Sequence, residues 1–341
     1  MSILANSLLL PARAGDRLVI LILALALDAI IGDPPALFAI VPHPVALIGK
    51  AIALFDRRLN RETRTERARR VRGIITLAFM ILGAGLAGLV LTLLAALIPQ
   101  GWILELIVVA ILVAQRSLFD HVMAVRRALE RDGLEAGRNA VSRIVGRDPQ
   151  TLDAFAVARA GIESLAENFS DAVVAPVLFY ALAGLPGLFI YKTANTLDSM
   201  IGHRSARYRA FGWASARFDD LLNLVPARLA GLILALSGLF LPGGRPLHSL
   251  KMMGRDASKH RSPNAGWPEA AMAGALGLAL AGPRRYGELL VDDPWLGDGR
   301  AQATPADMRR ALMMFVVACL IELLALAGVA LLLTRHALLP A

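Results

Sequence analysis

The chain has 341 residues, of which 56% are hydrophobic, and its mean hydropathy is +0.58. Soluble domains carry roughly 45–50% apolar residues, so the composition argues against an ordinary soluble protein and indicates burial in lipid. The single cysteine, Cys319, excludes an internal disulfide framework and a cysteine metal site. The formal net charge of +9 is typical of the cytoplasmic loops of membrane proteins, and no motif supports nucleic-acid binding.

The first apolar run, near residues 18–32, predicts a membrane helix. It does not have the features of a signal peptide, because it carries Asp28, is followed by Asp33 and lacks a small-residue cleavage signal. The next stretch, from Lys50 to Arg72, contains nine Lys or Arg residues against three acids. This excess predicts a cytoplasmic loop near the lipid headgroups.

The region 73–115 is long, apolar and uncharged as far as Leu104. It predicts a hairpin of membrane helices, because roughly 20 apolar residues span a bilayer and Pro99-Gln100-Gly101 supplies a turn. The string Gly83-Ala84-Gly85-Leu86-Ala87-Gly88 matches the glycine spacing of a dinucleotide-binding loop. No strand precedes it, so these small residues predict close helix packing instead.

Residues 116–171 are charged and amphipathic, which predicts helices outside the lipid. One helix is expected to end at Asp132-Gly133, and another to begin at Asp148-Pro149, where Asp caps and Pro takes the first helical position. No strand periodicity is visible in the chain. Further apolar runs lie at 172–190, 224–241, 268–282 and 311–334.

The intervening loops 191–223 and 242–267 are both basic and rich in reactive side chains. A single full crossing between them would place them on opposite sides of the membrane. At least one of the runs beside them is therefore predicted to be re-entrant, tilted or shorter than a full span, which is tolerable where irregular backbone lines a protein cavity.

These patterns predict an all-α fold, a polytopic integral membrane helical protein with an amphipathic helical region outside the lipid. We expect one membrane-embedded domain over residues 1–341. Its expected parts are N-terminal membrane helices with the basic loop (18–115), extramembrane helices (116–171), and motif-bearing membrane helices and loops (172–341).

The first polar motif is a row of carboxylates at the mouth of an apolar run. Glu163, Glu167 and Asp171 are spaced four apart and fall on one face of a continuous helix, with Asn168 on the adjacent face. Like charges at this spacing repel one another, so the row is either a solvated face paired with Arg159 or a site for Mg²⁺, which prefers oxygen ligands.

The second motif is the string from Tyr191 to Arg204, directly after an apolar run. Lys192, Asn195 and Ser199 share a helical face, and Asp198 lies one step round. Polar groups at a membrane boundary are costly unless paired. A loop that only reached the headgroups would need Lys and Arg but not this set, so the density indicates a site.

The third motif contains two adjacent acids, Asp219 and Asp220, followed by Asn223. Such acids can ligate a metal or transfer a proton. In the alternative interpretation they neutralise Arg217 and Arg228.

The fourth motif begins at Asp256. Lys259 and His260 would meet this acid at i+3 and i+4 of a helix, and Ser262-Pro263-Asn264-Ala265-Gly266 is a turn whose amides can hold an anion. Glu269 then enters the next apolar run. A lone histidine is more often structural, but its setting among Lys, Arg and Asp favours phosphate recognition.

In this order, the strings resemble the membrane-bound CbiB/CobD family of cobalamin biosynthesis, the adenosylcobinamide-phosphate synthases. The similarity covers most of the chain, although no motif can be placed in 284–310. The matching strings are Leu27-Asp28, Gly32-Asp33-Pro34, His43-Pro44-Val45, Ile48-Gly49, Glu163 to Asn168 with Asp171, Tyr191-Lys192, Asn195 to Gly202, Asp219-Asp220, Pro226-Ala227-Arg228 and Ser262 to Gly266.

The resemblance implies an ATP-dependent amide-forming ligase. It would join (R)-1-amino-2-propanol or its phosphate to a propionate carboxyl of adenosylcobyric acid, giving adenosylcobinamide or its phosphate. The implied cofactors are ATP and Mg²⁺. The implied partners are the corrinoid, the amino alcohol, the lipid bilayer and other enzymes of the pathway. The implied location is the inner cell membrane, with an active site facing the cytoplasm, where ATP is available.

Activation of a carboxylate as an acyl phosphate needs carboxylates for the metal and cations for the developing charge. We therefore assign roles as hypotheses. The metal ligands are Glu163, Glu167, Asp171 and Asp198. Contacts to the phosphate or the transition state come from Lys192, Lys259 and His260, and either Asp219 or Asp220 is the base. The remaining substrate contacts are Asn195, Ser199, Arg204, Arg228, Ser262 and Asn264.

Two other classes of protein share some of these features. An intramembrane Mg²⁺-dependent prenyltransferase would need two matched acidic clusters, and the string at Asp219 does not repeat the first one. A secondary transporter would need internal repeats with broken helices in corresponding places, and none is visible in the sequence.

Overall fold

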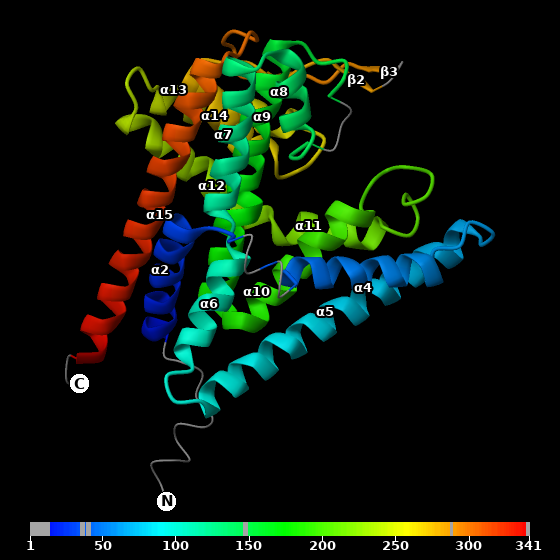
Figure 1. Cartoon of the computed structure of the whole chain (residues 1–341), viewed down its shortest axis with the longest axis vertical. Helices are drawn as coiled ribbons and strands as arrows, with labels where there is room; N and C mark the ends of the chain where they lie inside the picture. Colours follow the sequence, from blue (N-terminus) through cyan, green and yellow to red (C-terminus); the bar gives the residue numbers. More distant parts are fainter. Residues whose placement is uncertain (1–13, 35–37, 39–41, 146–148, 287–288, 339–341) are drawn as a thin grey trace, which may run out of the picture. The chain divides into compact units, whose positions relative to one another are not determined.

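The computed structural model describes residues 14–34, 38, 42–145, 149–286 and 289–338. Helices make up nearly all of the regular structure of these residues (Figure 1), which confirms the predicted all-α membrane fold. The chain forms two compact units, each assembled from separate stretches of sequence. Unit 1 contains Met1–Ala114, Ala175–Leu222 and Leu326–Ala341, and unit 2 contains Gln115–Val174 and Asn223–Ala325.

Within the described residues, four helical stretches are long and apolar enough to cross a membrane, and a bent pair, Trp213–Leu222 with Leu224–Phe240, raises the number to five if it is one span. The helix predicted near 18–32 forms as α2 (Ala14–Ile31). It includes three charged residues and is not among these candidate spans. The four stretches are Glu66–Leu97, Trp102–Arg131, Ala154–Ile201 and Pro305–Thr334.

Unit 1 is built around the helix α10, which contacts five other helices of this unit. In Figure 1, α4 and α5 run side by side, in blue and cyan. The bounds of these elements are α10 (Ala175–Ile201), α2, α4 (Pro44–Leu59), α5 (Glu66–Leu97), α6 (Trp102–Leu112) and α11 (Trp213–Leu222).

The helix α10 reverses direction at Gly184. This residue has φ 63° and ψ −152°, a backbone conformation open to glycine, and Pro186 follows it. The rings of Phe179 and Tyr191 stack with centroids 5.0 Å apart. Twelve residues of straight helix would separate them by about 18 Å, so the two arms of α10 fold back on each other. The run 172–190 therefore contains a reversal of the chain and is not one straight helix.

The predicted loop over Lys50–Arg72 is wrong, because most of this stretch is helical. The helix α4 continues to Leu59, and α5 begins at Glu66 after the N-cap Thr65, whose side chain accepts a hydrogen bond from the Ala68 amide (3.3 Å). Charged residues do not end a helix when they occupy its outer face. The charge excess correctly indicated an exposed surface but did not indicate a loop.

The membrane hairpin predicted over 73–115 forms from α5 and α6. Its turn lies at Pro99-Gln100-Gly101, and Gln100 has a positive φ of 60°. The prediction that the glycines of α5 serve helix packing is confirmed for Gly85 and Gly88 but not for Gly83, where an added Cβ atom would meet no described atom within 4 Å. A Cβ atom added to Gly88 would lie 2.6 Å from the Cα of Pro186 on α10.

Unit 2 is built around the short helix α14 (Gly266–Leu276), nearly all of whose residues are buried. It ends at Gly277, which has φ 69° and caps the helix in the left-handed conformation. Eleven residues of helix extend about 16 Å, against the roughly 30 Å of a bilayer core. The helical part of the run 268–282 is therefore shorter than a membrane span. A short run was one of the alternatives predicted from the two basic loops.

Most other elements of unit 2 surround this core. The helix α7 ends at Arg131, as predicted, and Gly133 follows with φ 90°. The bounds are α7 (Gln115–Arg131), α8 (Leu134–Val141), α9 (Ala154–Phe169), the π-helix η1 (Ser170–Val174), α12 (Leu224–Ser237), η2 (Gly238–Phe240), α13 (Pro246–Asp256) and η3 (Ala257–Lys259). The last helix, α15 (Pro305–Leu338), starts in unit 2 and ends within the stretch assigned to unit 1.

Two sequence predictions for unit 2 are corrected by the structure. The helix expected from Pro149 begins at Ala154, because Asp153 is the N-cap and accepts a hydrogen bond from the Ala156 amide (2.7 Å). Asp148 lies outside the described residues. Short strands also occur where none was predicted, since two or three residues are too few to show alternation. They are β1 (Leu280–Ala281) antiparallel to β4 (Trp295–Leu296), and β2 (Arg284–Tyr286) antiparallel to β3 (Leu289–Val291).

The close approach of α5 to the α10 reversal can be tested at Gly88. We expect Gly88→Val to destabilise the protein by about 1–3 kcal/mol, because the added side chain meets backbone atoms that cannot move aside cheaply. Thermal unfolding of the purified protein measures the effect. Gly83→Val is the matched control on the same helix, since a Cβ atom there meets no described atom within 4 Å. Equal effects of the two variants would contradict this packing.

Candidate active site

Lys192 and two other ionisable residues from separate parts of unit 1, His43 and Asp33, are linked by electrostatic interactions. This lysine lies on the returning arm of α10 and is only 7% exposed. His43 is the N-cap of α4, and its Nδ1 accepts a hydrogen bond from the Val45 amide (3.2 Å). Burial lowers the pKa of His43, with the Asp33 carboxylate opposing this shift and the Lys192 charge adding to it. The charges of Asp33 and Lys192 therefore both act on the His43 imidazole.

A second polar group of unit 1 lies at the end of α10 and on α11. Asp198 interacts electrostatically with Asp220 and His203. Asp220 in turn forms an ion pair with Arg217 (3.3 Å) and interacts with Arg204. The structure thus brings together the predicted Asp198, Arg204 and Asp220, although they belong to two separate sequence motifs.

The other predicted residues of unit 1 flank these groups. Asn195 is half-buried and Ser199 is exposed, and both follow Lys192 on the same helix at the predicted spacing. Asp219 is buried. The pairing of Asp220 with Arg217 agrees with the neutralisation interpretation of the third motif.

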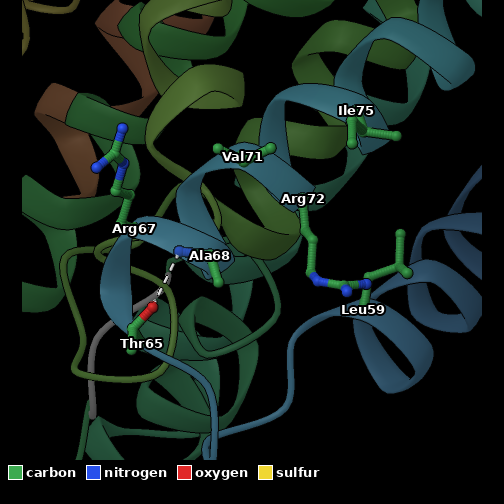
Figure 2. Close-up of a pocket in the computed structure, with 7 residues that line it drawn as sticks. All are labelled: Leu59, Thr65, Arg67, Ala68, Val71, Arg72 and Ile75. Carbon is green, nitrogen blue, oxygen red and sulfur yellow. Dashed lines mark hydrogen bonds between the residues drawn. The ribbon is translucent and has the colours of Figure 1, made fainter.

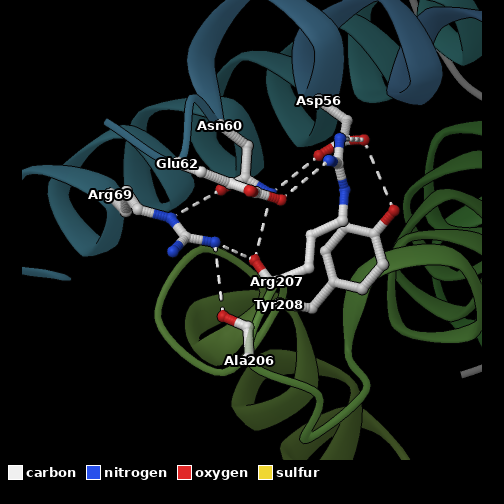
Figure 3. A network of polar contacts seen from close by, with 7 residues as sticks. All are labelled: Asp56, Asn60, Glu62, Arg69, Ala206, Arg207 and Tyr208. Carbon is white, nitrogen blue, oxygen red and sulfur yellow. Dashed lines mark hydrogen bonds and ion pairs between the residues drawn. The ribbon is translucent and has the colours of Figure 1, made fainter. Parts of the chain in front are cut away.

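The loop after α10 is tied to α4 and α5 by a polar network (Figure 3). Asp56 accepts hydrogen bonds from Asn60 (2.8 Å) and from the Arg207 guanidinium (2.8 Å). Arg69 donates to the Asn60 side-chain oxygen (2.8 Å) and to the Arg207 carbonyl. Because Asp56, Asn60 and Arg69 are all buried, the network fixes the loop that carries His203 and Arg204.

The fourth motif of unit 2 forms, but its charges are paired within the protein. Asp256 is fully buried and accepts hydrogen bonds from Arg255, from the Lys259 ammonium and from the Gly297 amide, each at 2.7 Å. Burial alone would raise the pKa of Asp256, but these donors hold it well below its usual range. The predicted contact between Asp256 and Lys259 is confirmed, and it is an ion pair that stabilises the buried carboxylate.

His260 and the turn after it form a separate set of contacts. The Nδ1 atom of His260 accepts a hydrogen bond from the Ser262 amide (3.0 Å), and its Nε2 lies 3.8 Å from Glu269. The amides of Asn264 and Ala265 donate to the Ser262 hydroxyl (3.2 and 3.3 Å). Three amides of the expected anion-binding turn are thus already bonded inside the loop.

The carboxylate row of the first motif does not share one environment. Glu163 is buried and accepts a hydrogen bond from the Ala281 amide (2.8 Å), whereas Glu167 is exposed. Asp171 lies in the π-helix η1, so the three acids are not on one continuous α-helix as the spacing argument assumed. Within the described residues, no group of three His, Cys, Asp or Glu side chains is gathered closely enough to hold a metal ion.

The arginines near these motifs have aromatic partners. Arg159 donates to the Ala301 carbonyl (2.7 Å), and its guanidinium lies over Trp295. Arg228 donates to the Leu224 carbonyl (2.6 Å) and lies 4.4 Å from the ring centre of Trp267. The expected pairing of Arg228 with the acids of the third motif is therefore replaced by stacking on Trp267.

A family model described as CobD/Cbib protein matches residues 21–315. The chain belongs to the CobD/CbiB family. It is 54% identical over 305 residues to cobalamin biosynthesis protein CobD of Sinorhizobium sp, covering 89% of this chain and 94% of that protein. Proteins with the same name from Rhizobium meliloti and Rhodobacter capsulatus are 51% and 47% identical, covering 93% and 86% of this chain and 98% and 91% of theirs. No solved structure matches the chain.

Membership of the CobD/CbiB family places the protein in cobalamin biosynthesis, as the resemblance implied. The strings that carried the resemblance fall in both units. Unit 1 gathers Asp33, His43 and Lys192, of which only Lys192 was assigned to the site from the sequence. Asp33 and His43 could have been found from the sequence only because they lie in strings that match the family. Their spacing along the chain gave no reason to link them with Lys192.

The network in Figure 3 predicts that Asp56→Asn loosens the loop 203–212. Loss of the carboxylate charge weakens the hydrogen bond to Arg207. We expect the free energy of unfolding to fall by about 1–3 kcal/mol, towards the lower value because the Arg207 side chain is partly exposed. Limited trypsin digestion at the arginines of this loop, together with thermal unfolding, measures the change. Glu66→Gln is the control, because its ion pair with Arg209 is exposed and such pairs contribute at most about 1 kcal/mol.

The environment of His43 predicts a pH dependence of stability. Because the folded protein holds the pKa of His43 below its usual 6.5, the unfolded chain takes up the proton first as the pH falls. The stability linked to His43 is present above about pH 6.5 and is lost below it. His43→Asn keeps a capping acceptor but does not titrate, so its unfolding temperature should fall less between pH 7.5 and 5.5. A fall equal to that of the wild-type protein would contradict the assignment.

Proposed function

We propose that this protein joins (R)-1-amino-2-propanol or its phosphate to a propionate carboxyl of adenosylcobyric acid with consumption of ATP. The main support is the cluster of Lys192, His43 and Asp33 in a member of the CobD/CbiB family. A buried lysine is retained where its charge has a partner or a task. Here the task is to stabilise the negative charge that develops during phosphoryl transfer.

The reaction follows two balanced steps. A carboxylate oxygen of the corrinoid attacks the terminal phosphorus of ATP, which forms an acyl phosphate and releases ADP. The amine nitrogen of the amino alcohol then attacks the acyl carbon, which forms the amide C–N bond and releases phosphate. The amine must lose one proton in this step, so a base beside it accelerates the reaction.

The residues of unit 1 suit these requirements. We assign the Lys192 ammonium to stabilise the phosphoryl oxygens, and Arg204 is the second cation, interacting with Asp220. The Nδ1 atom of His43 already accepts a hydrogen bond from the Val45 amide, so His43 is not assigned as the base. Asp219 or Asp220 is the proposed base for the amine.

The proposed cofactor Mg²⁺ fits the pair Asp198 and Asp220 better than the carboxylate row of unit 2. Mg²⁺ is usually held by one or two carboxylates together with substrate phosphates, so a group of three acids is not required. Glu163 is already bonded to the Ala281 amide, and Glu167 is exposed. When bound, the ion would neutralise phosphate charge during the transfer.

The predicted residues of unit 2 are retained as proposed contacts to substrate phosphate. Their observed contacts also stabilise the fold, so a mutation at any of them would change stability as well as substrate binding. The residues concerned are Arg228, Lys259, His260, Ser262 and Asn264. We also propose that the protein lies in the inner membrane with its site facing the cytoplasm, where ATP and the other enzymes of the pathway are found.

Product formation tests this proposal directly. Purified protein incubated with adenosylcobyric acid, ATP, Mg²⁺ and each amine should give a mass increase corresponding to amide formation with at least one amine. ADP should be released in step with the product. We expect Lys192→Met, which keeps the length but removes the charge, to lower turnover by about 100-fold or more.

Lys251→Met is the matched control, because Lys251 is exposed on α13 and lies outside the proposed site. Its turnover should equal that of the wild-type protein. Absence of the amide with both amines would reject the function. Substrate-dependent ATP hydrolysis also separates this ligase from a prenyltransferase or a transporter, neither of which should hydrolyse ATP in response to these substrates.

A further inference from the structure

A cavity of about 610 Å³ lies between the end of α4 and the first turns of α5, entirely within unit 1 (Figure 2). Neither the family strings nor the proposed active site includes it. Figure 2 shows Arg72 extending from α5 towards Leu59 of α4. The lining residues are Leu59, Thr65, Arg67, Ala68, Val71, Arg72 and Ile75.

The cavity lies at the boundary between the charged and the apolar parts of α5. This helix has 32 residues and therefore extends about 48 Å, whereas a bilayer core is about 30 Å thick. Arg72 is the last charged residue of α5, and the remainder of the helix to Leu97 is uncharged. Val71 and Ile75 are half-exposed or nearly so. The charged end of the cavity thus belongs at headgroup level and Ile75 at the start of the hydrocarbon.

The acids of this stretch are committed to other partners. Asp56 and Glu62 pair with Arg207, and Glu66 pairs with Arg209. Among the described residues, no ion pair to Arg67 or Arg72 is formed. The positive charge around the cavity is therefore not neutralised by these three carboxylates.

Several arginines are crowded at the same place. The pKa of Arg64 is lowered first by desolvation and then by the positive charges of Arg72 and Arg61. Arg64 donates to the Leu59 carbonyl (3.4 Å), which keeps it beside the cavity. The first turn of α5 adds the positive end of a helix dipole. An anion at this position would relieve the repulsion.

We propose that this cavity binds one anionic phospholipid, with the phosphate beside Arg67 and Arg72 and an acyl chain along Val71 and Ile75. The combination of cationic and apolar lining is complementary to a lipid and exceeds what a free phosphate requires. Basic residues near a membrane surface each contribute about 1 kcal/mol to the binding of anionic lipid. The site is independent of the proposed ligase activity.

Native mass spectrometry of the full-length protein in detergent tests the site. The probes are phosphatidylglycerol and phosphatidylcholine, titrated separately and in competition. We expect wild-type protein to retain phosphatidylglycerol preferentially with a stoichiometry of one. Arg67→Gln/Arg72→Gln, which removes the two arginines that line the cavity, should weaken this binding by about 30-fold. Arg57→Gln/Arg58→Gln is the charge-matched control, since neither residue lines the cavity, and it should leave the binding unchanged.

A second variant tests the contribution of the cavity without changing any charge. Ala68→Phe leaves every arginine in place but fills the cavity, and it should also lower phosphatidylglycerol binding by about 10-fold. Gel filtration and thermal unfolding establish that each variant is folded. Equal losses in both arginine pairs, or full binding by Ala68→Phe, would overturn the proposal. Displacement of the lipid by millimolar inorganic phosphate would also overturn it, because that result identifies a free-anion site.

Discussion

The reversal of α10 at Gly184 is the constraint on which unit 1 depends. The stacking of Phe179 on Tyr191 at 5.0 Å is possible only because the helix folds back within a few residues. The returning arm carries Lys192 and Asp198, and α10 packs with α2, α4 and α5. Glycine at this position is needed because a side chain would oppose its backbone conformation. Because of the reversal, the apolar part of α10 leads into a second arm that carries polar residues of the candidate site.

The loop after α10 extends this support through charge pairing. Asp56, Asn60 and Arg69 are buried at the contact of α4 with α5, and they bind the backbone and side chain of Arg207. A buried polar network is costly unless all its members are satisfied, and it then favours one conformation strongly. The same pairing removes the local acids from Arg67 and Arg72. One arrangement of charges therefore fixes the loop and leaves a cationic cavity at the membrane boundary.

The two units contain similar charged and polar residues in different settings. In unit 2, Lys259 and Arg255 stabilise the buried Asp256 carboxylate, and the amides of the turn at Ser262 bond within the loop. In unit 1, the charges of Lys192 and Asp33, from distant parts of the chain, act on the pKa of His43 in opposite directions. Polar density in a sequence thus does not distinguish a buried structural ion pair from an active site, because both require the same side chains.

The sequence by itself determined the helical membrane character, the α5–α6 hairpin, the packing glycines and the family. These depend on composition, on hydrophobic run length and on local turn residues, which act over short distances along the chain. Only the tertiary structure decided that Asp33 and Lys192 act electrostatically on His43, that Asp171 lies in the π-helix η1, and that most of the stretch Lys50–Arg72 is helical. Those outcomes depend on which distant side chains meet, and burial and charge pairing between distant segments are not encoded in residue spacing.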